Sequence, residues 1–523
     1  MSALNRQEPA PRAWTWLLPV FYMLLIGMYF LLRYQGRWAE SDSTVFSATI
    51  RDFVREGRLI PTEGEVYPNG YAYQAISLFI ISMTGVEVTT LQQIMYPLLA
   101  GIVAVPAWTL YREFTGSVRG ATIGTIVLLT QPEFLFVILR SSHEKFTRTI
   151  LIICLVLLIR SFKYLQRPAL FALYVGMFYV ATYALISINN LLAHSFIFSV
   201  ALTLGLARMF DRRVREVNEG QRIIARLTYA TLVCLGLAYL FTFYAYAPAQ
   251  HDLQVLHSIY ERVAALFLDV EQQSTNPYSV VSAGWVNLRV YFMVSLANWI
   301  VLGVSFALWL RQGWRWIVKR REQPGEVAWI LWLLYLAFAL QGVISALADA
   351  SGAIGNLQHR VFPSFSIIAV AVVASALADW RPRRFALLAQ TGMAALIGCL
   401  ALLSVFKATN EPTLSNKWTF YRDNELLAIE WEDRYLRDSE IWTEFDERLG
   451  MAYFANRGSL QNRNQLFAND LRPTTRSLVV TELTKLRGAR LGRALPLPAD
   501  ALRIYDNGEA QVFRLRPETP FQK

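Results

Sequence analysis

The residues best suited to chemistry gather in three polar segments that interrupt a largely apolar chain. The first begins Glu40-Ser41-Asp42-Ser43 and leads into a predicted amphipathic helix whose apolar stripe runs from Phe46 to Val54. A carboxylate held where a membrane segment ends can act as a general base or as a metal ligand. Asp42, with Glu40 nearby, is placed for either task. Asp42 or Ser43 also suits the N-cap of the helix, and the two roles are compatible.

The second polar segment is short, lies between two apolar runs and extends from Arg140 to Arg148. Lys145 and Arg148 are typical of cations that anchor helix ends at lipid headgroups, whereas His143 and Glu144 fit that role poorly. Glu144 and Asp42 offer hard oxygen ligands for a divalent cation, with His143 as a further ligand or as a hydrogen-bond donor. We therefore predict a metal site at Asp42, Glu144 and His143.

The third segment ends His359-Arg360 at the start of an apolar run. An arginine at this depth lies level with lipid phosphates, and a guanidinium group binds a phosphate through two hydrogen bonds. Ordinary anchoring at the membrane surface also explains Arg360, but it does not require His359.

The composition indicates the environment in which these segments operate. Of 523 residues, 54% are hydrophobic and only 17% are charged, which is too apolar for one soluble domain of this length. The net charge of +11 comes from short basic clusters between apolar runs, so we expect membrane lipid and not nucleic acid as the partner. The three cysteines all lie in apolar runs and predict neither disulfides nor a thiolate metal site.

Eleven runs approach the ~20 residues that a membrane span requires. They are 14–32, 91–111, 119–139, 147–162, 169–187, 190–208, 226–246, 288–309, 327–347, 361–379 and 385–406. The shorter run 71–84 is predicted to be an interfacial or re-entrant helix, because this choice puts the basic connections on the same side as the N-terminus. We thus predict a multi-pass protein of the plasma membrane with a cytoplasmic N-terminus. Segments 33–90, 140–146, 247–287 and 348–360 would face outward.

The chain changes character after the last apolar run, so we divide it into a membrane domain, 1–406, and a soluble extracytoplasmic α/β domain, 407–523. Within the second domain, Leu478-Val479-Val480 predicts a buried strand and residues 424–434 predict a helix. Residues 502–515 predict a β-hairpin around Asp506-Asn507-Gly508.

Taken together, the acidic first outer segment, the short second one, the late outer arginine and the α/β tail resemble the GT-C superfamily of membrane glycosyltransferases. Within it the chain is most similar to the catalytic subunit of oligosaccharyltransferase. Asp446 and Asn456-Arg457 lie where that family has a Trp-Trp-Asp-Tyr-Gly segment and an Asn-Arg pair. The Trp-Trp-Asp-Tyr-Gly sequence itself is absent, so the resemblance does not imply an Asn-x-Ser/Thr acceptor.

The resemblance implies a fold of about eleven membrane helices and an enzyme that takes a sugar or oligosaccharide from a polyprenyl phosphate or diphosphate. Asp42 and Glu144 would take the roles of the family's catalytic carboxylates, with Mg²⁺ or Mn²⁺ as a possible cofactor. Arg360, helped by His359 or Arg140, would stabilise the charge that grows on the departing lipid phosphate.

Two other classes of protein compete with this interpretation. A transporter or lipid flippase commonly has repeated halves and ionisable residues inside its helices, and only Glu133 in the run 119–139 fits that pattern. A membrane-anchored binding protein would keep the fold and use only its tail. Loss of sugar from a polyprenyl-linked donor would distinguish an enzyme from both.

Overall fold

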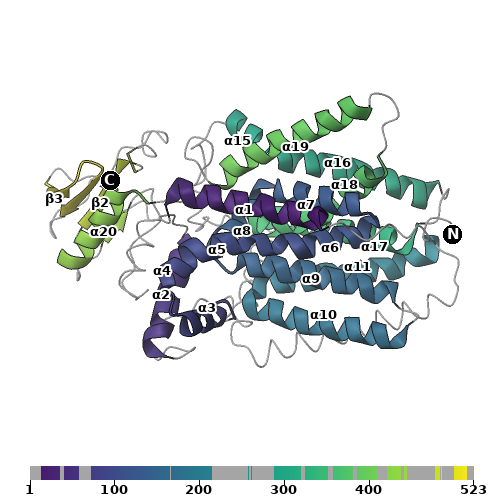
Figure 1. The fold of residues 1–523 in the computed structure, drawn as a ribbon, viewed down its shortest axis with the longest axis horizontal. Coiled ribbons are helices and arrows are strands. Elements are labelled where there is room, and N and C mark those ends of the chain that lie inside the picture. Colours follow the sequence, from purple (N-terminus) through teal and green to yellow (C-terminus); the bar gives the residue numbers. More distant parts are fainter. Residues whose placement is uncertain are drawn as a thin grey trace.

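The structure is a computed structural model of the chain. It describes residues 13–35, 41–57, 72–164, 167–214, 257, 261, 288–319, 324–350, 357–380, 386–409, 421–436, 441–443, 477–482, 484–485 and 500–514. Within these ranges the protein is mainly helical, with a bundle of long apolar helices and a small C-terminal sheet (Figure 1).

The helices of the first half are α1 (Trp14–Tyr34), α2 (Ser41–Glu56), α3 (Ala72–Thr84), α4 (Val88–Thr90), η1 (Leu91–Met95), α5 (Tyr96–Leu99), η2 (Ala100–Val103), α6 (Ala104–Thr115), α7 (Val118–Leu129), α8 (Pro132–Leu139), α9 (Glu144–Lys163), α10 (Pro168–Ile188) and α11 (Asn190–Val214). Those of the second half are α15 (Leu288–Val294), α16 (Leu296–Gly313), η3 (Trp314–Val318), α17 (Glu326–Ala350), α18 (Leu357–Asp379), α19 (Ala386–Ala408) and α20 (Asp423–Tyr435). Helix α18 is central, because its residues from Ile367 to Ala374 are almost all fully buried.

Seven helical stretches in the described part of the chain are long and apolar enough to cross a membrane, and the bent pair α7 and α8 makes an eighth if it counts as one span. The protein is thus a multi-pass membrane protein, with fewer spans among the described residues than the eleven predicted. The predicted run 288–309 is divided at Ser295 into α15 and α16, and 147–162 belongs to α9, which carries charged residues at both ends. The predicted span 226–246 lies outside the described residues.

A sharp bend between α7 and α8 directs the chain toward the second polar segment. Helix α7 begins at Ser117, whose side chain accepts a hydrogen bond from the Gly120 N–H at 3.3 Å. It ends before Pro132, which has no N–H to continue the helical ladder and instead begins α8. The axes of the two helices differ by 76°. Helix α8 ends at Leu139, and Arg140 follows it at the end of the bundle.

Helices α2 and α3 form a small apolar cluster of their own beside the bundle. Phe46 and Ile50 of α2 pack with Tyr73 of α3 and with Tyr96, and all four side chains are buried. Helix α3 has 13 residues and would span about 20 Å, which is too short for a hydrocarbon core of ~30 Å. Its length agrees with the prediction that 71–84 does not cross the membrane.

The C-terminal part contains a four-stranded sheet of order β1-β2-β4-β3. Its strands are β1 (Ile441–Thr443), β2 (Ser477–Thr481), β3 (Leu502–Asp506) and β4 (Ala510–Arg514), and only β1 and β2 pair in parallel. The predicted hairpin is confirmed, since β3 and β4 pair across a turn in which Gly508 has a φ of 91°. The buried strand and the helix predicted at 424–434 are confirmed as β2 and α20.

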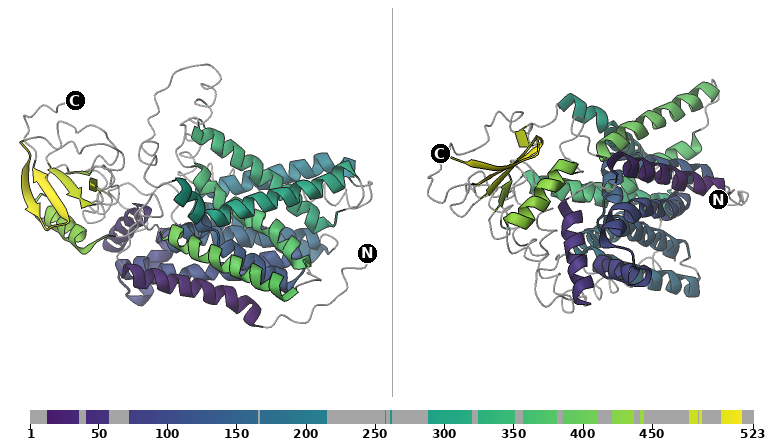
Figure 2. Two further views of the ribbon diagram at one scale, coloured as in Figure 1. Left: turned by 90° about the horizontal axis from the view of Figure 1, so that it is seen from above. Right: turned by 60° about the vertical axis from the view of Figure 1, so that its left-hand side comes forward.

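The C-terminal sheet with α20 and the helices α2 and α3 lie at the same end of the molecule, opposite to the end of the bundle where α1 begins (Figures 1 and 2). A hydrogen bond of 2.6 Å from the Tyr34 hydroxyl to the carbonyl of Thr409 joins the ends of α1 and α19 there. The C-terminal part therefore follows α19 from the end of the bundle where α1 finishes and α2 begins.

Candidate functional site

The connection from α8 to α9 is closed on itself by a buried lysine. The ammonium group of Lys145 donates to the carbonyl of Arg140 at 2.6 Å and to that of Ser142 at 3.5 Å, and it lies 5.3 Å from the ring centroid of Tyr96. Lys145 and Arg148 are both fully buried. This burial does not favour the interpretation in which the two cations anchor helix ends at lipid headgroups, because both donate to polar groups of the protein.

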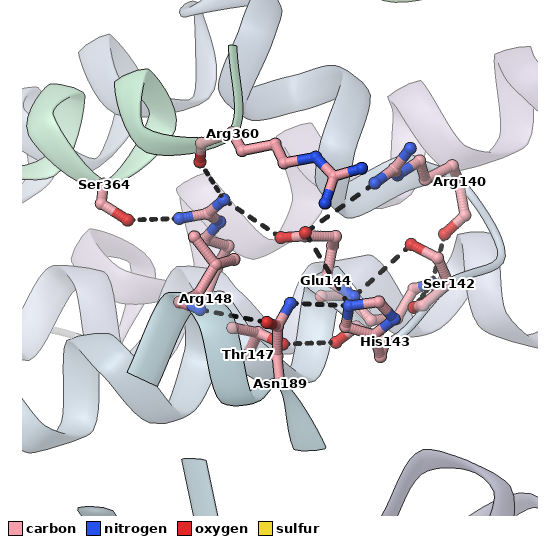
Figure 3. A network of polar contacts seen from close by, with 11 residues as sticks. Arg140, Ser142, His143, Glu144, Thr147, Arg148, Asn189, Arg360 and Ser364 are labelled. Atoms are coloured by element: carbon pink, nitrogen blue, oxygen red, sulfur yellow. Dashed lines mark hydrogen bonds and ion pairs between the residues drawn. The ribbon is translucent and has the colours of Figure 1, made fainter. Parts of the chain in front are cut away.

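Glu144, the first residue of α9, stands at the centre of a cluster of cations (Figure 3). Its carboxylate forms an ion pair with Arg148 at 3.1 Å and lies 3.8 Å from the guanidinium group of Arg140. The side chain of Arg360 extends from α18 toward Glu144, and its guanidinium group lies between those of Arg148 and Arg140 (Figure 3). One carboxylate thus faces three guanidinium groups. We call Arg140, Glu144, Arg148 and Arg360 the charge cluster.

Within the charge cluster, Arg148 connects α9 to the start of α18. One of its terminal nitrogens donates to the hydroxyl of Ser364, and the other donates to the carbonyl of Arg360 at 2.8 Å. Pro363 lies inside α18 and lacks the N–H that would bond to the carbonyl four residues earlier. Arg148 donates to the carbonyl of the following residue, Arg360, and so adds a hydrogen bond in the turn that Pro363 weakens.

Two ionisable groups at the start of α9, before the apolar run that begins at residue 147, have shifted pKa values. Burial disfavours the charged form of Glu144, but the nearby cations, led by Arg148, outweigh this and hold its pKa below the usual range. Burial also lowers the pKa of Lys145 to about 7, and the positive charge of Arg140 acts in the same direction. Glu144 is therefore ionised at neutral pH and is poorly suited to donate a proton.

His143 joins the second polar segment to α2 and to the end of α10. The ring of Phe46 packs edge-on against it, with centroids 5.1 Å apart. The side-chain oxygen of Asn189 accepts from the Leu192 N–H at 3.1 Å, so its amide nitrogen faces the imidazole Nε2 at 2.6 Å. Nε2 then accepts this bond, which favours the neutral tautomer with the proton on Nδ1.

The structure brings four of the predicted site residues together, namely Arg140, His143, Glu144 and Arg360. Asp42 lies in the first turn of α2, four residues before Phe46 and so on the same helical face, but its side chain is outside the described set, as is that of His359. Glu40, Asp446 and the pair Asn456-Arg457 lie outside the described residues.

The described residues do not fit the predicted metal site at Glu144 and His143. No group of three or more His, Cys, Asp or Glu side chains placed to hold a metal ion occurs in the described ranges. Glu144 faces three guanidinium groups, whose charges repel a divalent cation, and Nε2 of His143 is engaged by Asn189. A cation at Asp42 would need other ligands.

Sequence reasoning missed Arg148, Ser364 and Asn189 as parts of the site. The spacing of Glu144 and Arg148, four residues apart on a helix, is the local signal that indicates their ion pair. No comparable signal indicates Ser364, which lies 216 residues from Arg148 in the sequence. Asn189 follows α10 and meets His143, 46 residues earlier, a contact that no local pattern indicates.

Glu133, the one residue that favoured a transporter, is engaged in a structural ion pair. It pairs with Lys407 at the end of α19, and the same ammonium group donates to the hydroxyl of Ser295 at 2.7 Å. Ser404 of α19 also donates to the carbonyl of Thr130 at the α7–α8 bend. These contacts attach the C-terminal end of α19 to α8.

Comparison with known proteins identifies the fold. No protein-family model and no curated sequence matches the chain. Among solved structures, the oligosaccharyltransferase AglB of Archaeoglobus fulgidus, bound to an inhibitory peptide and a dolichol-phosphate, matches with a TM-score of 0.61 at 10% identity, over 97% of this chain and 75% of that one. ArnT of Cupriavidus metallidurans, bound to undecaprenyl phosphate, matches with a TM-score of 0.53 at 11% identity, over 96% and 98% of the two chains. The similarity to GT-C enzymes predicted from the sequence is thus confirmed at the level of structure, and the chain has the GT-C fold of these membrane glycosyltransferases.

Proposed function

We propose that the protein is a membrane glycosyltransferase that moves a sugar or oligosaccharide from a polyprenyl phosphate or diphosphate to an acceptor on the outer side of the plasma membrane. The observation that carries the proposal is the charge cluster. Its three guanidinium groups and one carboxylate carry a net charge of +2. This charge lies at the end of the bundle where α2 begins. Such an excess suits an anionic lipid phosphate.

Two structural relatives support a lipid phosphate as the ligand. The archaeal oligosaccharyltransferase structure contains a dolichol-phosphate, and the ArnT structure contains undecaprenyl phosphate. Both ligands join a long isoprenoid chain to a phosphate. By analogy, the donor of this protein would lie with its chain among the apolar helices and its phosphate at Arg360 and Arg140.

The two halves of the charge cluster have different tasks in the proposed reaction. Arg148 is fully buried and Glu144 is almost fully buried, and the two form a rigid support for the other two arginines. The side chain of Arg360 is exposed and can contact the donor, with Arg140 beside it. Glu144 then orients the arginines. Of the two catalytic carboxylates that the sequence suggested, only Asp42 keeps a direct role in this proposal.

The proposed reaction is a displacement at the anomeric carbon. The nucleophilic atom of the acceptor forms a bond to that carbon, the bond from carbon to phosphate oxygen breaks, and its electron pair stays on the phosphate. Asp42 takes the proton of the acceptor as a general base. Arg360 and Arg140 stabilise the charge that grows on the departing phosphate, and His359 is a further donor to it. The described residues around Glu144 and His143 do not fit a metal ion, so the roles above are given to side chains of the protein alone.

The activity test uses the purified full-length protein with polyprenyl-phosphate and polyprenyl-diphosphate sugars, and it measures sugar released from or transferred off the lipid. Wild type should turn over at least one donor, and Arg360→Ala should reduce kcat/KM by about 10²-fold or more, as loss of one charge-stabilising donor does in other enzymes. Asp42→Asn should cost about 10²–10⁴-fold in kcat, the range for general-base catalysis.

A matched control is available at the opposite end of α18. Arg119 of α7 is exposed and donates to the carbonyl of Trp380 at 3.4 Å. Trp380 directly follows α18 and lies twenty residues, or about 30 Å along the helix, from Arg360. Arg119→Ala should leave turnover close to that of wild type. Turnover that survives both Arg360→Ala and Asp42→Asn would contradict the site, and no turnover of any donor by wild type would contradict the function.

A further inference from the structure

We propose that Asp349 is a positioning residue for Arg360, and that it acts by holding the first turn of α18. The proposal rests on the function proposed above, since it concerns the arginine assigned to the donor phosphate. Asp349 lies at the end of α17, and its two carboxylate oxygens accept hydrogen bonds from the Leu357 N–H at 2.8 Å and from the Gln358 N–H at 2.7 Å. These are the first two residues of α18, and Arg360 follows in the same turn.

The position of Asp349 in its own helix points to this task. A carboxylate in the last turn of a helix faces the negative end of the helix dipole and destabilises that helix. Asp349 is the second-last residue of α17, so it lies at the unfavourable end there. At the start of α18 the same charge faces a positive helix end with unpaired N–H groups, where it is favourable. Its contribution is therefore to α18.

The first turn of α18 is thus held from two sides. Asp349 binds its N–H groups, and Arg148 binds the carbonyl of Arg360 at 2.8 Å. Both attachments fix the backbone from which the Arg360 side chain extends, while that side chain stays exposed. Arg360 itself carries a positive charge near the positive end of α18, an arrangement that the carboxylate of Asp349 compensates.

Asp349 needs no contact with the donor to affect the reaction. Two-point binding of a phosphate by a guanidinium group depends on the direction of its N–H bonds, and a displacement of about 1 Å can cost ~10²-fold in rate. Fraying of the first turn of α18 would displace Arg360 in this way. We therefore expect replacement of Asp349 to weaken donor binding and turnover only when Arg360 is present.

The first experiment does not depend on the function. Amide hydrogen exchange of peptides that cover residues 357–362 is measured in wild type, Asp349→Ala and Asp349→Asn. Loss of a hydrogen bond worth ~1 kcal/mol should accelerate exchange in Asp349→Ala by roughly fivefold to tenfold, and Asp349→Asn, which keeps one acceptor oxygen, should fall between. Ser117→Ala removes the corresponding cap of α7 and should accelerate exchange only there. Unchanged exchange at 357–362 in Asp349→Ala would overturn the proposal.

The second experiment is a double-mutant cycle on transfer activity. Asp349→Ala alone should raise the KM for the lipid donor and lower kcat/KM by about tenfold or more, whereas Ser117→Ala should not change either value. In an Arg360→Ala background, Asp349→Ala should have no further effect on kcat/KM. Equal losses in both backgrounds would show that Asp349 acts independently of Arg360 and would overturn the proposal. If wild type turns over no donor, the proposed function fails, and hydrogen exchange still decides whether Asp349 holds α18.

Discussion

Replacement of Arg148 by methionine tests whether the charge cluster is held together by its buried ion pair. The substitution keeps an unbranched side chain but leaves Glu144 almost fully buried, with Arg140 at 3.8 Å as its nearest remaining guanidinium group. Breaking a buried pair by removing one partner typically costs 3–5 kcal/mol. We therefore expect Arg148→Met to lower the unfolding free energy by at least ~3 kcal/mol. This is a large part of the about 5–15 kcal/mol by which whole domains are typically stable.

The assay is denaturation in detergent micelles followed by tryptophan fluorescence, with a second variant as a matched control. Arg160 lies on the same helix and pairs with Glu113 at 2.8 Å, but its side chain is 36% exposed, so Arg160→Met should cost less than ~1 kcal/mol. Adding Glu144→Gln to Arg148→Met removes the stranded charge and should restore part of the stability, without restoring transfer activity. A loss below 1 kcal/mol in Arg148→Met, or a double variant as unstable as the sum of its single changes, would refute this reasoning.

Three further predictions follow from other contacts. Phe46→Ala should destabilise the protein by about 3–5 kcal/mol and reduce turnover, because Phe46 is buried against His143 and fixes α2; thermal unfolding and the transfer assay measure both effects. Burial moves the pKa of Lys145 from 10.5 to about 7, so the unfolded chain binds more protons in this range and stability should rise with pH between about 7 and 10.5; Lys145→Met should flatten a plot of melting temperature against pH. The neutral double variant Glu133→Gln with Lys407→Met should keep transfer activity, and loss of transfer by a variant that still folds would contradict the purely structural role assigned to this ion pair.

Local sequence patterns predicted the elements whose causes are local. The β3–β4 hairpin follows from turn residues next to each other in the chain, and the long apolar helices follow from their hydropathy. The interruptions were harder to predict. The run 288–309 is largely apolar, yet it divides at Ser295, where the hydroxyl of this residue meets Lys407 from another helix. Hydropathy averages over such a contact and does not reveal it.

The sequence predicted several residues of the site from their types, but it predicted only part of the contacts between them. Glu144 and Arg360 stood out because charged residues are rare beside apolar runs, and the structure places both in one cluster. Arg148 was not singled out as a site residue, because an arginine near a helix end has an ordinary explanation at the membrane surface. Its buried partners include the Arg360 carbonyl, 212 residues away, and nothing in the local sequence encodes that pairing.

The charge cluster has a cost that the fold alone does not explain. A buried ion pair is often no more stabilising than apolar residues of the same volume, so the pair of Glu144 and Arg148 gains little for the stability of the bundle. The pair does fix the orientation of donors in advance of a ligand, which is what stabilisation of a departing phosphate requires. Arg148 and Asp349 both hold the backbone beside Arg360, while the guanidinium group of Arg360 stays exposed. A rigid support under one accessible cation is the arrangement expected of a site that binds an anion, and it gives the buried charges a reason to be there.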